Sequence, residues 1–466
     1  MGRIEQQQPD FLNTLEGAYR RSGSQPHDPK LMLRMVLYEI LEARRSPAQW
    51  HRDIPINKAL LWLGRGIRPS RTACYTFRDR MGLVIQSIHE ILMKRALSDH
   101  LLKGTTGVLD GTFVRACASR HRLVNHQTLT TRIEQLRAAS MLDTQQQTLD
   151  VIPKWMARTA AGRLEQQHRF LKAMTVLEQR LAANRRKPKD KRLQERRVYV
   201  STSDPEAPLG RDKEKVFGPI YAPQFVIDSE SRLVMAWDVF AQATDSGTLS
   251  PMIDSAKHIM GDQLRKVSAD SGYCSLLDLQ ICESQAIELF APFQENSLTE
   301  EKRQANPPKQ IPRSRFEWNA TEQTYRCPEG HLLKHTGRER RSRRNSEFVF
   351  EHRFQCPREL CQSCPLMSQC LRPGSSSRTI KRLEGQERIE AHQLKMKTEE
   401  AKAIHRLRGS LVERSFGDAK RHRQFQRFHG RGLARAKAET GLVILAQNLL
   451  TLSRLRNLAK PTPQTS

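Results

Sequence analysis

The sequence predicts an α/β protein with a mixed-sheet core, helical and cysteine-rich insertions, and an all-helical domain before the core. Three observations predict this fold class. Short β-rich segments alternate with amphipathic helical segments between residues 105 and 291. Helical periodicity fills the first 103 residues, and residues 296–400 change to proline-rich, polar and cysteine-bearing sequence. At 466 residues the chain is too long for one ordinary hydrophobic core, so we expect several structural units.

The N-terminal domain is predicted over residues 1–103. Residues 31–41 place apolar side chains at helical spacing, and a second helix is predicted at 57–63. After a glycine-rich turn, Ser70 is in position to cap a helix that runs through Phe77. Helix, glycine turn and helix is the pattern of a helix-turn-helix, so this domain is predicted to bind DNA. An ordinary helical bundle that packs on the core is the alternative.

The first part of the core is predicted over residues 104–295. Residues 107–114 are glycine-punctuated and β-rich, and they predict a strand that carries Asp110. A basic helical segment at about 120–198 interrupts the strands, which then resume with a hairpin turn at 228–232. Further strands are predicted at 225–227, 233–240, 264–270 and 287–291, and helices at 249–260 and 276–284. This order predicts a mixed sheet.

The remaining chain is predicted to form three segments. Residues 296–400 form a cysteine-rich insertion, and helical periodicity returns over 401–458 to complete the core. Residues 459–466 are predicted to be a tail.

The formal charge of +28, from 78 Lys and Arg against 50 Asp and Glu, predicts a polyanionic partner. The excess is uneven, because residues 151–200 hold 14 basic and 4 acidic side chains, and residues 401–466 hold 14 and 3. A solvated, soluble surface is the alternative, but solubility needs a net charge of magnitude only about 2–8 in a small domain. We therefore expect a nucleic-acid-binding protein.

Location and redox state also follow from composition. The sequence contains no apolar run of 18 residues, and its first residues lack the apolar core of a secretory signal. We expect a cytoplasmic protein without a membrane partner. Nine cysteines, an odd number that is partly clustered, argue against a secreted disulfide framework.

Three carboxylates are candidates for metal-dependent chemistry on phosphodiesters. Asp110 lies in the first predicted strand, Asp270 ends a later strand, and Glu413 lies on a helix seven residues before Lys420. Magnesium requires oxygen ligands on rigid elements, and two such ions activate the attacking oxygen and stabilise the leaving one. Each residue alone has a simpler interpretation: an aspartate at a strand end is usually a turn residue, and a glutamate in a basic helix is usually a surface charge.

Together these segments resemble the three acidic blocks of DDE transposases from bacterial insertion sequences. The blocks are Leu109–Thr112, Ser268–Tyr273 and Val412–Lys420, and the segments Gly430–Leu433 and Ala446–Leu449 resemble those that follow the family's glutamate. The resemblance covers nearly the whole chain. It implies an RNase H-like catalytic core in which Asp110, Asp270 and Glu413 hold Mg²⁺ or Mn²⁺.

The sequence departs from the family at one position. Related transposases often carry an arginine four residues before the glutamate, but that position is Gly409 here, and Arg408 is one residue further away. Arg408 is therefore not among the predicted site residues.

Five basic residues are predicted to contact DNA. The resemblance assigns this role to Lys420, and the basic residues after it extend the surface. The second helix of the helix-turn-helix pattern adds side chains from its first two turns. The predicted contacts are Lys420, Arg421, Arg423, Arg71 and Arg78.

The resemblance implies a transposase that binds terminal inverted repeats, cleaves at the transposon ends and joins the 3′-hydroxyls to target DNA. Because two ends are held at once, a homodimer in a synaptic complex is expected. Two alternatives remain at this stage. One is a transposase-derived DNA-binding protein without cleavage activity, and the other is an RNase H-like nuclease that does not join strands.

The cysteine cluster predicts a structural zinc site with Cys356, Cys361, Cys364 and Cys370 as ligands. Cys327 and His331 lie upstream of it. A loose loop with reduced thiols is the alternative, because the spacings are less regular than paired C-x₂-C motifs. Arginines at 338, 340, 341, 343 and 344 suggest that this insertion also touches DNA.

Overall fold

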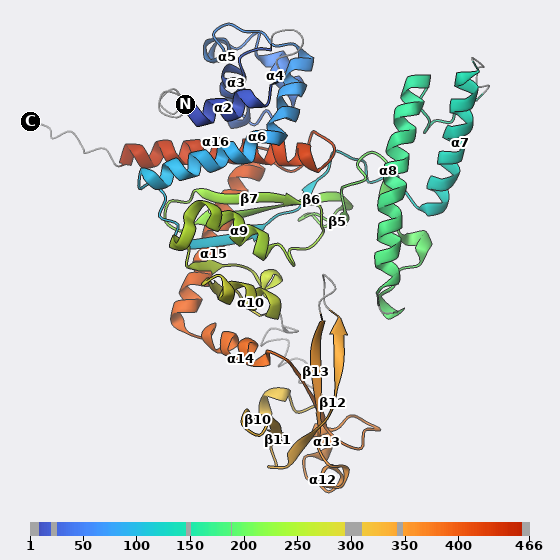
Figure 1. Cartoon of the computed structure of the whole chain (residues 1–466), viewed down its shortest axis with the longest axis vertical. Helices are drawn as coiled ribbons and strands as arrows, with labels where there is room; N and C mark the ends of the chain where they lie inside the picture. The colour runs from blue at the N-terminus through green and yellow to red at the C-terminus, as the bar shows by residue number, and fades with distance from the viewer. Residues whose placement is uncertain are drawn as a thin grey trace, which may run out of the picture. The chain divides into compact units, whose positions relative to one another are not determined.

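The computed structural model describes residues 9–19, 26–145, 151–187, 189–293, 310–342 and 348–458. The chain divides into two compact units (Figure 1). Unit 1 comprises residues 1–273, 281–291 and 402–466, and unit 2 comprises residues 274–280 and 292–401. The predicted tail at 459–466 lies outside the described residues. In the described part, no helix is both long and apolar enough to cross a membrane.

The N-terminal residues form five described helices. Asn57 and Ser70 cap the last two of them, because their side chains accept hydrogen bonds from the backbone N–H groups of Ala59 (2.9 Å) and Ala73 (3.1 Å). The predicted cap at Ser70 is thus confirmed. The helices are α2 (Pro9–Gly17), α3 (Pro29–Leu41), α4 (Pro47–Asp53), α5 (Lys58–Leu63) and α6 (Arg71–Ser98). They belong to the same compact unit as the large sheet.

Unit 1 is built on a mixed seven-stranded sheet with the order β2-β6-β1-β8-β9, and β5 and β7 also pair with β6. β1 runs antiparallel to β6 but parallel to β8, and β8 runs parallel to β9. The strands are β1 (Thr106–Gly111), β2 (Val114–Arg115), β5 (Leu209–Arg211), β6 (Phe217–Asp228), β7 (Val234–Phe240), β8 (Lys266–Ser268) and β9 (Glu288–Phe290). The predicted mixed α/β class is confirmed.

Helices cover the sheet. α9 (Leu249–Met260) and α16 (Leu433–Leu458) contact β7, and Figure 1 shows α6 and α16 packed side by side. α10 (Leu276–Ser284) connects β8 to β9. α15 (Glu399–Gly417) lies against β6, where the Phe416 ring stacks on Phe225 at 4.8 Å between centroids. α15 continues directly into a π-helical turn, η7 (Asp418–His422).

The basic helical segment forms its own layer within unit 1. α7 (His126–Thr144) and α8 (Ala160–Arg185) pack as a pair, and the short strands β3 (Leu123–Val124) and β4 (Val200–Ser201) pair at its base. The pair has its own apolar cluster, in which Phe170 and Leu177 are buried and Trp155 and Met174 are half-buried.

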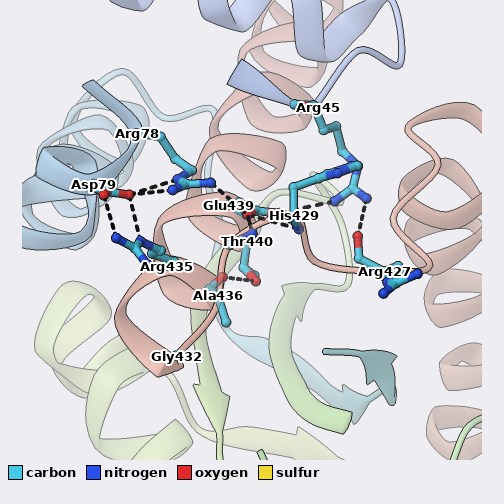
Figure 2. Close-up of polar contacts among 12 residues, drawn as sticks. Arg45, Arg78, Asp79, Arg427, His429, Gly432, Arg435, Ala436, Glu439 and Thr440 are labelled. Carbon is cyan, nitrogen blue, oxygen red and sulfur yellow. Dashed lines mark hydrogen bonds and ion pairs between the residues drawn. The ribbon is translucent and has the colours of Figure 1, made fainter. Parts of the chain in front are cut away.

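A buried ionic cluster joins the N-terminal helices to α16 (Figure 2). The Glu439 carboxylate lies 3.9 Å from a guanidinium nitrogen of Arg45 and 3.9 Å from one of Arg78, and it accepts backbone N–H groups from His429 and Gly430. All three charged side chains are at most 4% exposed. Because a buried charge needs both opposite charges and hydrogen bonds, this cluster fixes the loop before α16 against α6.

Unit 2 contains a five-stranded antiparallel sheet with the order β10-β11-β12-β13-β14. A small aromatic and aliphatic core that includes Tyr325 and Phe354 lies against it. The elements are β10 (Glu317–Asn319), β11 (Thr324–Arg326), β12 (Leu332–Ser342), β13 (Phe348–Gln355), β14 (Thr379–Leu383), α12 (Arg358–Gln362), α13 (Met367–Cys370) and α14 (Gln386–Lys395).

Candidate active site

The first two predicted carboxylates lie at the same end of neighbouring parallel strands. Val108 of β1 pairs with Ser268 of β8, and each predicted aspartate follows two residues later. Asp110 and Asp270 therefore occupy equivalent positions on β1 and just beyond β8. The parallel pairing explains why residues 160 apart in the sequence reach one place.

Both aspartates face one guanidinium nitrogen. Nη2 of Arg408, on α15, lies 3.1 Å from Oδ2 of Asp110 and 3.4 Å from Oδ2 of Asp270. The Asp110 side chain is 18% exposed and that of Asp270 is 55% exposed, so the cluster opens to solvent on the Asp270 side. Sequence reasoning left Arg408 out because it is one residue away from the family's arginine position. The structure places it at the centre of the cluster.

A third carboxylate near the cluster was missed by sequence reasoning. Asp245 lies in the loop between β7 and α9, and its Oδ1 accepts a hydrogen bond of 2.8 Å from Nε2 of Gln224. The hydroxyl of Tyr273 donates to Oε1 of the same glutamine. Gly111 makes room for this glutamine, because a Cβ there would lie 2.1 Å from its Nε2. Asp245 sits in a polar loop sequence, so only tertiary contacts identify it.

The pKa values of Asp110 and Asp245 are both raised. Burial raises the pKa of Asp110, Arg408 and the backbone N–H of Gly111 lower it, and repulsion from Asp245 and Asp270 raises it further. Burial likewise raises the pKa of Asp245, and Asp270 adds to this increase. Three carboxylates against one arginine leave an excess of negative charge, which is the electrostatic setting for divalent cations.

The third predicted ligand, Glu413, lies apart from this contact. Its side chain is exposed on α15, five residues after Arg408 or about 7.5 Å along the helix axis. Among the described residues, no group of three His, Cys, Asp or Glu side chains is already arranged to hold a metal ion. The structure thus brings Asp110 and Asp270 together and leaves Glu413 outside the contact.

Two of the predicted DNA contacts are buried. Arg78 is 3% exposed and donates to Asp79 at 2.7 Å, and Arg423 is 8% exposed and is bound to Asp418 and to the carbonyl oxygen of Leu41. Both side chains are paired inside the protein, and burial leaves almost none of either side chain accessible to a phosphate. We therefore remove Arg78 and Arg423 from the DNA surface.

The other three predicted DNA contacts remain accessible. Arg71 is exposed on the first turn of α6, and Arg421 is exposed in the π-helical turn. Lys420 is half-buried in the same turn, and burial followed by repulsion from Lys213 lowers its pKa. π-helical turns within helices often occur at functional sites.

The cysteine-rich part of unit 2 encloses a small cavity of about 20 Å³. Five thiols line it together with His331 and Arg378; they are those of Cys327, Cys356, Cys361, Cys364 and Cys370. A space of this size holds one water-sized particle. Burial and the neighbouring thiols raise the pKa of Cys356 to about 12. Cys327 thus joins the four predicted cysteines.

Residues 326–453 match a protein-family model described as the transposase DDE domain. The match covers less than half of the chain. It includes the later cysteines, Arg408 and Glu413, and it begins after Asp110 and Asp270. The match supports a DDE transposase. No curated protein and no solved structure matches the chain.

Proposed function

We propose that this protein is a DNA transposase that binds terminal inverted repeats, cleaves at the transposon ends and joins the 3′-hydroxyls to target DNA. One observation carries the proposal. Asp110 and Asp270 meet at the ends of two parallel strands on one side of Arg408, which belongs to the segment that matches the transposase domain. The strand order β7-β6-β1-β8-β9, with β6 antiparallel to its neighbours, supports the RNase H-like core that the sequence resemblance implies.

The donor set fits divalent cations. Asp110 and Asp270 provide carboxylate oxygens on rigid elements, and they would hold Mg²⁺ or Mn²⁺. Glu413 is the third proposed ligand, and Asp245 is close enough to Asp110 to raise the pKa of that carboxyl. The bound metal would activate the attacking oxygen and stabilise the leaving one. Arg408 supplies the positive charge that offsets the aspartates, and its buried Nε has no hydrogen-bond partner among the described residues.

DNA binding by the proposed enzyme rests on basic surface residues. Arg71 on α6, together with Lys420 and Arg421 in the π-helical turn, is proposed to contact DNA. The formal charge of +28 supports a binding free energy with a large salt-dependent part. A homodimer would hold two transposon ends at once.

The catalytic test uses four single variants and one matched control. Asp110→Asn, Asp270→Asn and Glu413→Gln each remove a charged oxygen at nearly constant volume, and Asp245→Asn tests the carboxylate found only in the structure. We expect Asp110→Asn and Asp270→Asn to lower Mg²⁺-dependent cleavage at least about 100-fold, because each removes a charged metal ligand. The control is Asp254→Asn, an exposed aspartate on α9.

The readouts separate the proposed reaction from its alternatives. Cleavage and joining are measured on a plasmid that carries the DNA flanking the gene, and DNA binding is measured by fluorescence anisotropy. A variant that binds DNA within twofold of the wild-type affinity but does not cleave it has lost the chemical step and not DNA binding. Wild-type cleavage by Asp110→Asn or Asp270→Asn contradicts the proposed site. A wild-type protein that cleaves but cannot join a pre-cut end is a nuclease, and one that only binds is a DNA-binding protein.

We also propose that the cysteine cavity of unit 2 holds one structural zinc ion. Four thiolates are the usual tetrahedral set, and five cysteines line this cavity. The sequence prediction named Cys356, Cys361, Cys364 and Cys370, and Cys327 is an additional candidate. The backbone N–H of His331 donates to the Cys327 sulfur at 3.3 Å, which suits a sulfur that carries negative charge.

A further inference from the structure

The strands β12 and β13 extend beyond the rest of the sheet in unit 2. β14 pairs with β13 only from Glu351 to Gln355, and β11 pairs with β12 only at Leu332 and Leu333. Beyond these contacts, β12 and β13 continue as a two-stranded ribbon in which Arg340 pairs with Phe350 and Ser342 pairs with Phe348. Figure 1 shows this ribbon extending away from the helices α12 and α13 of the same unit.

One face of the ribbon carries arginines stacked on aromatic rings. Cross-strand partners share a face, so Arg338, Arg340, Phe348 and Phe350 lie together, and we call these four residues the ribbon face. The guanidinium carbon of Arg338 lies 4.4 Å from the centroid of the Phe350 ring, and that of Arg340 lies 3.7 Å from the centroid of the Phe348 ring. Both arginines are exposed, and Phe348 is 45% exposed.

The opposite face carries two ion pairs. Glu339 pairs with Arg353, and Lys381 lies 2.9 Å from Glu351. Next to the ribbon face, Glu384 lies 3.3 Å from His352, and no carboxylate among the described residues contacts Arg338 or Arg340. Arg338 and Arg340 therefore present their positive charges on the ribbon face without a carboxylate partner among the described residues.

A stacked guanidinium uses its flat face, so its in-plane N–H donors stay available. Such donors form paired hydrogen bonds with phosphate oxygens or with the edge of guanine. The major groove of B-DNA is about 12 Å wide and admits a two-stranded β-ribbon. Stacking also holds each long side chain in one direction, which lowers the entropy lost on binding.

We propose that the ribbon face binds duplex DNA by entering a groove, as a second DNA surface of this protein. The proposal rests on the proposed function in so far as DNA is the substrate. It adds an element, a face and a mode of contact that the transposase reaction does not require. Duplex DNA is favoured over an acidic protein or a single-stranded nucleic acid, because only the duplex has a groove bordered by two rows of phosphates.

The test compares two double variants of the full-length protein. Arg338→Gln with Arg340→Gln removes both charges from the ribbon face and leaves the strands intact. Arg358→Gln with Arg372→Gln removes the same charge from exposed positions elsewhere in unit 2. Affinity for a labelled 40-base-pair duplex is measured by fluorescence anisotropy at several salt concentrations, without added magnesium, so that cleavage chemistry plays no part.

We expect the ribbon variant to bind duplex DNA roughly tenfold more weakly than wild type. The slope of log affinity against log salt should fall by roughly 2, because each lost phosphate contact lowers it by about 0.9. The control variant should stay within about twofold of wild type, and both variants should share the wild-type thermal unfolding midpoint. Lysines at 338 and 340 should keep the slope but not the full affinity, because they preserve charge without the paired hydrogen bonds.

Three outcomes overturn the proposal. A ribbon variant with wild-type affinity and slope shows that this face does not contact DNA. Equal losses in the ribbon and control variants show a general effect of charge. A ribbon variant that loses binding to single-stranded DNA or RNA of the same length, while duplex binding is unchanged, assigns the face to another nucleic acid. If the ribbon effect is present but the protein never cleaves, only the proposed catalytic function fails.

Discussion

At the scale of single residues, the candidate active site combines positions that the sequence predicts with positions that it hides. Asp110 and Asp270 were predictable because Asp110 lies in a short β-rich segment, Asp270 ends another, and both segments resemble blocks of the family. Arg408 and Asp245 were not predictable, for two different reasons. A single-residue shift in spacing removed Arg408 from the family pattern, and Asp245 acquires its role only when β6 and the loop before α9 meet.

The raised pKa of Asp110 leads to a prediction about stability against pH. A carboxyl whose pKa is higher in the folded than in the unfolded state stays protonated to a higher pH in the folded protein. The free energy of unfolding therefore falls as pH rises from the ordinary carboxyl pKa of 3.8 through the higher pKa of Asp110 in the folded protein. Asparagine cannot ionise, so Asp110→Asn should unfold at a higher temperature than wild type near pH 7, and this gain should shrink toward pH 4.

Thermal unfolding midpoints of wild type and Asp110→Asn between pH 4 and 8 check this prediction. Added Mg²⁺ should raise the midpoint of wild type more than that of the variant, because the metal binds the charged carboxylate. A difference between the two proteins that does not change with pH would contradict the assignment of Asp110 as a carboxyl with a raised pKa.

At the scale of elements, periodicity predicted the strands and helices of unit 1 but not those of unit 2. β1, α9 and α16 carry clear apolar patterns, and the structure contains them close to the predicted positions. β10 to β14 are short or rich in charge, and they bury one small core rather than a continuous apolar face. Their pairing depends on the tertiary fold, which a local pattern does not encode.

The ionic cluster around Glu439 gives an element-scale prediction. Glu439→Gln removes the charge that offsets two arginines which are at most 4% exposed, so it should destabilise unit 1 by about 3–5 kcal/mol. Asp99→Asn is the matched control, because Asp99, just after α6, forms partly exposed ion pairs of 2.9 Å with Arg456 of α16 and with Arg95. The Asp99→Asn substitution should lower the free energy of unfolding by at most about 1 kcal/mol. Urea unfolding measures the free energy of unfolding of both variants. Equal losses in the two variants would show that burial does not determine how much an ion pair contributes to stability.

Zinc content gives the second prediction at this scale. The purified, reduced protein should carry about one Zn²⁺ per chain, and each of the five cysteines around the cavity is replaced singly by serine. Four of the variants should lose zinc and one should keep it, which identifies the ligand set. Cys117→Ser, in unit 1, is the control and should keep it. Elemental analysis that finds no zinc in the wild-type protein contradicts the site.

At the scale of the whole molecule, the N-terminal helices belong to the same compact unit as the large sheet. Phe77, Met81 and Ile85 of α6 are at most 1% exposed, and α6 packs along α16. Removal of residues 1–100 would expose this apolar surface and leave Glu439 without Arg45 and Arg78. A truncated chain therefore cannot test DNA specificity, because loss of folding and loss of recognition would look alike.

Surface substitutions test recognition without that ambiguity, and they give the last prediction. Arg68 and Arg71 are exposed on either side of the Ser70 cap. Their replacement together by glutamine should lower the preference for terminal-repeat DNA over shuffled DNA roughly tenfold, if the start of α6 reads base edges. Nonspecific binding should remain, because it depends on basic residues across the whole surface. Fluorescence anisotropy with both duplexes measures the ratio of the two affinities. An unchanged ratio would show that the start of α6 does not recognise the terminal repeat.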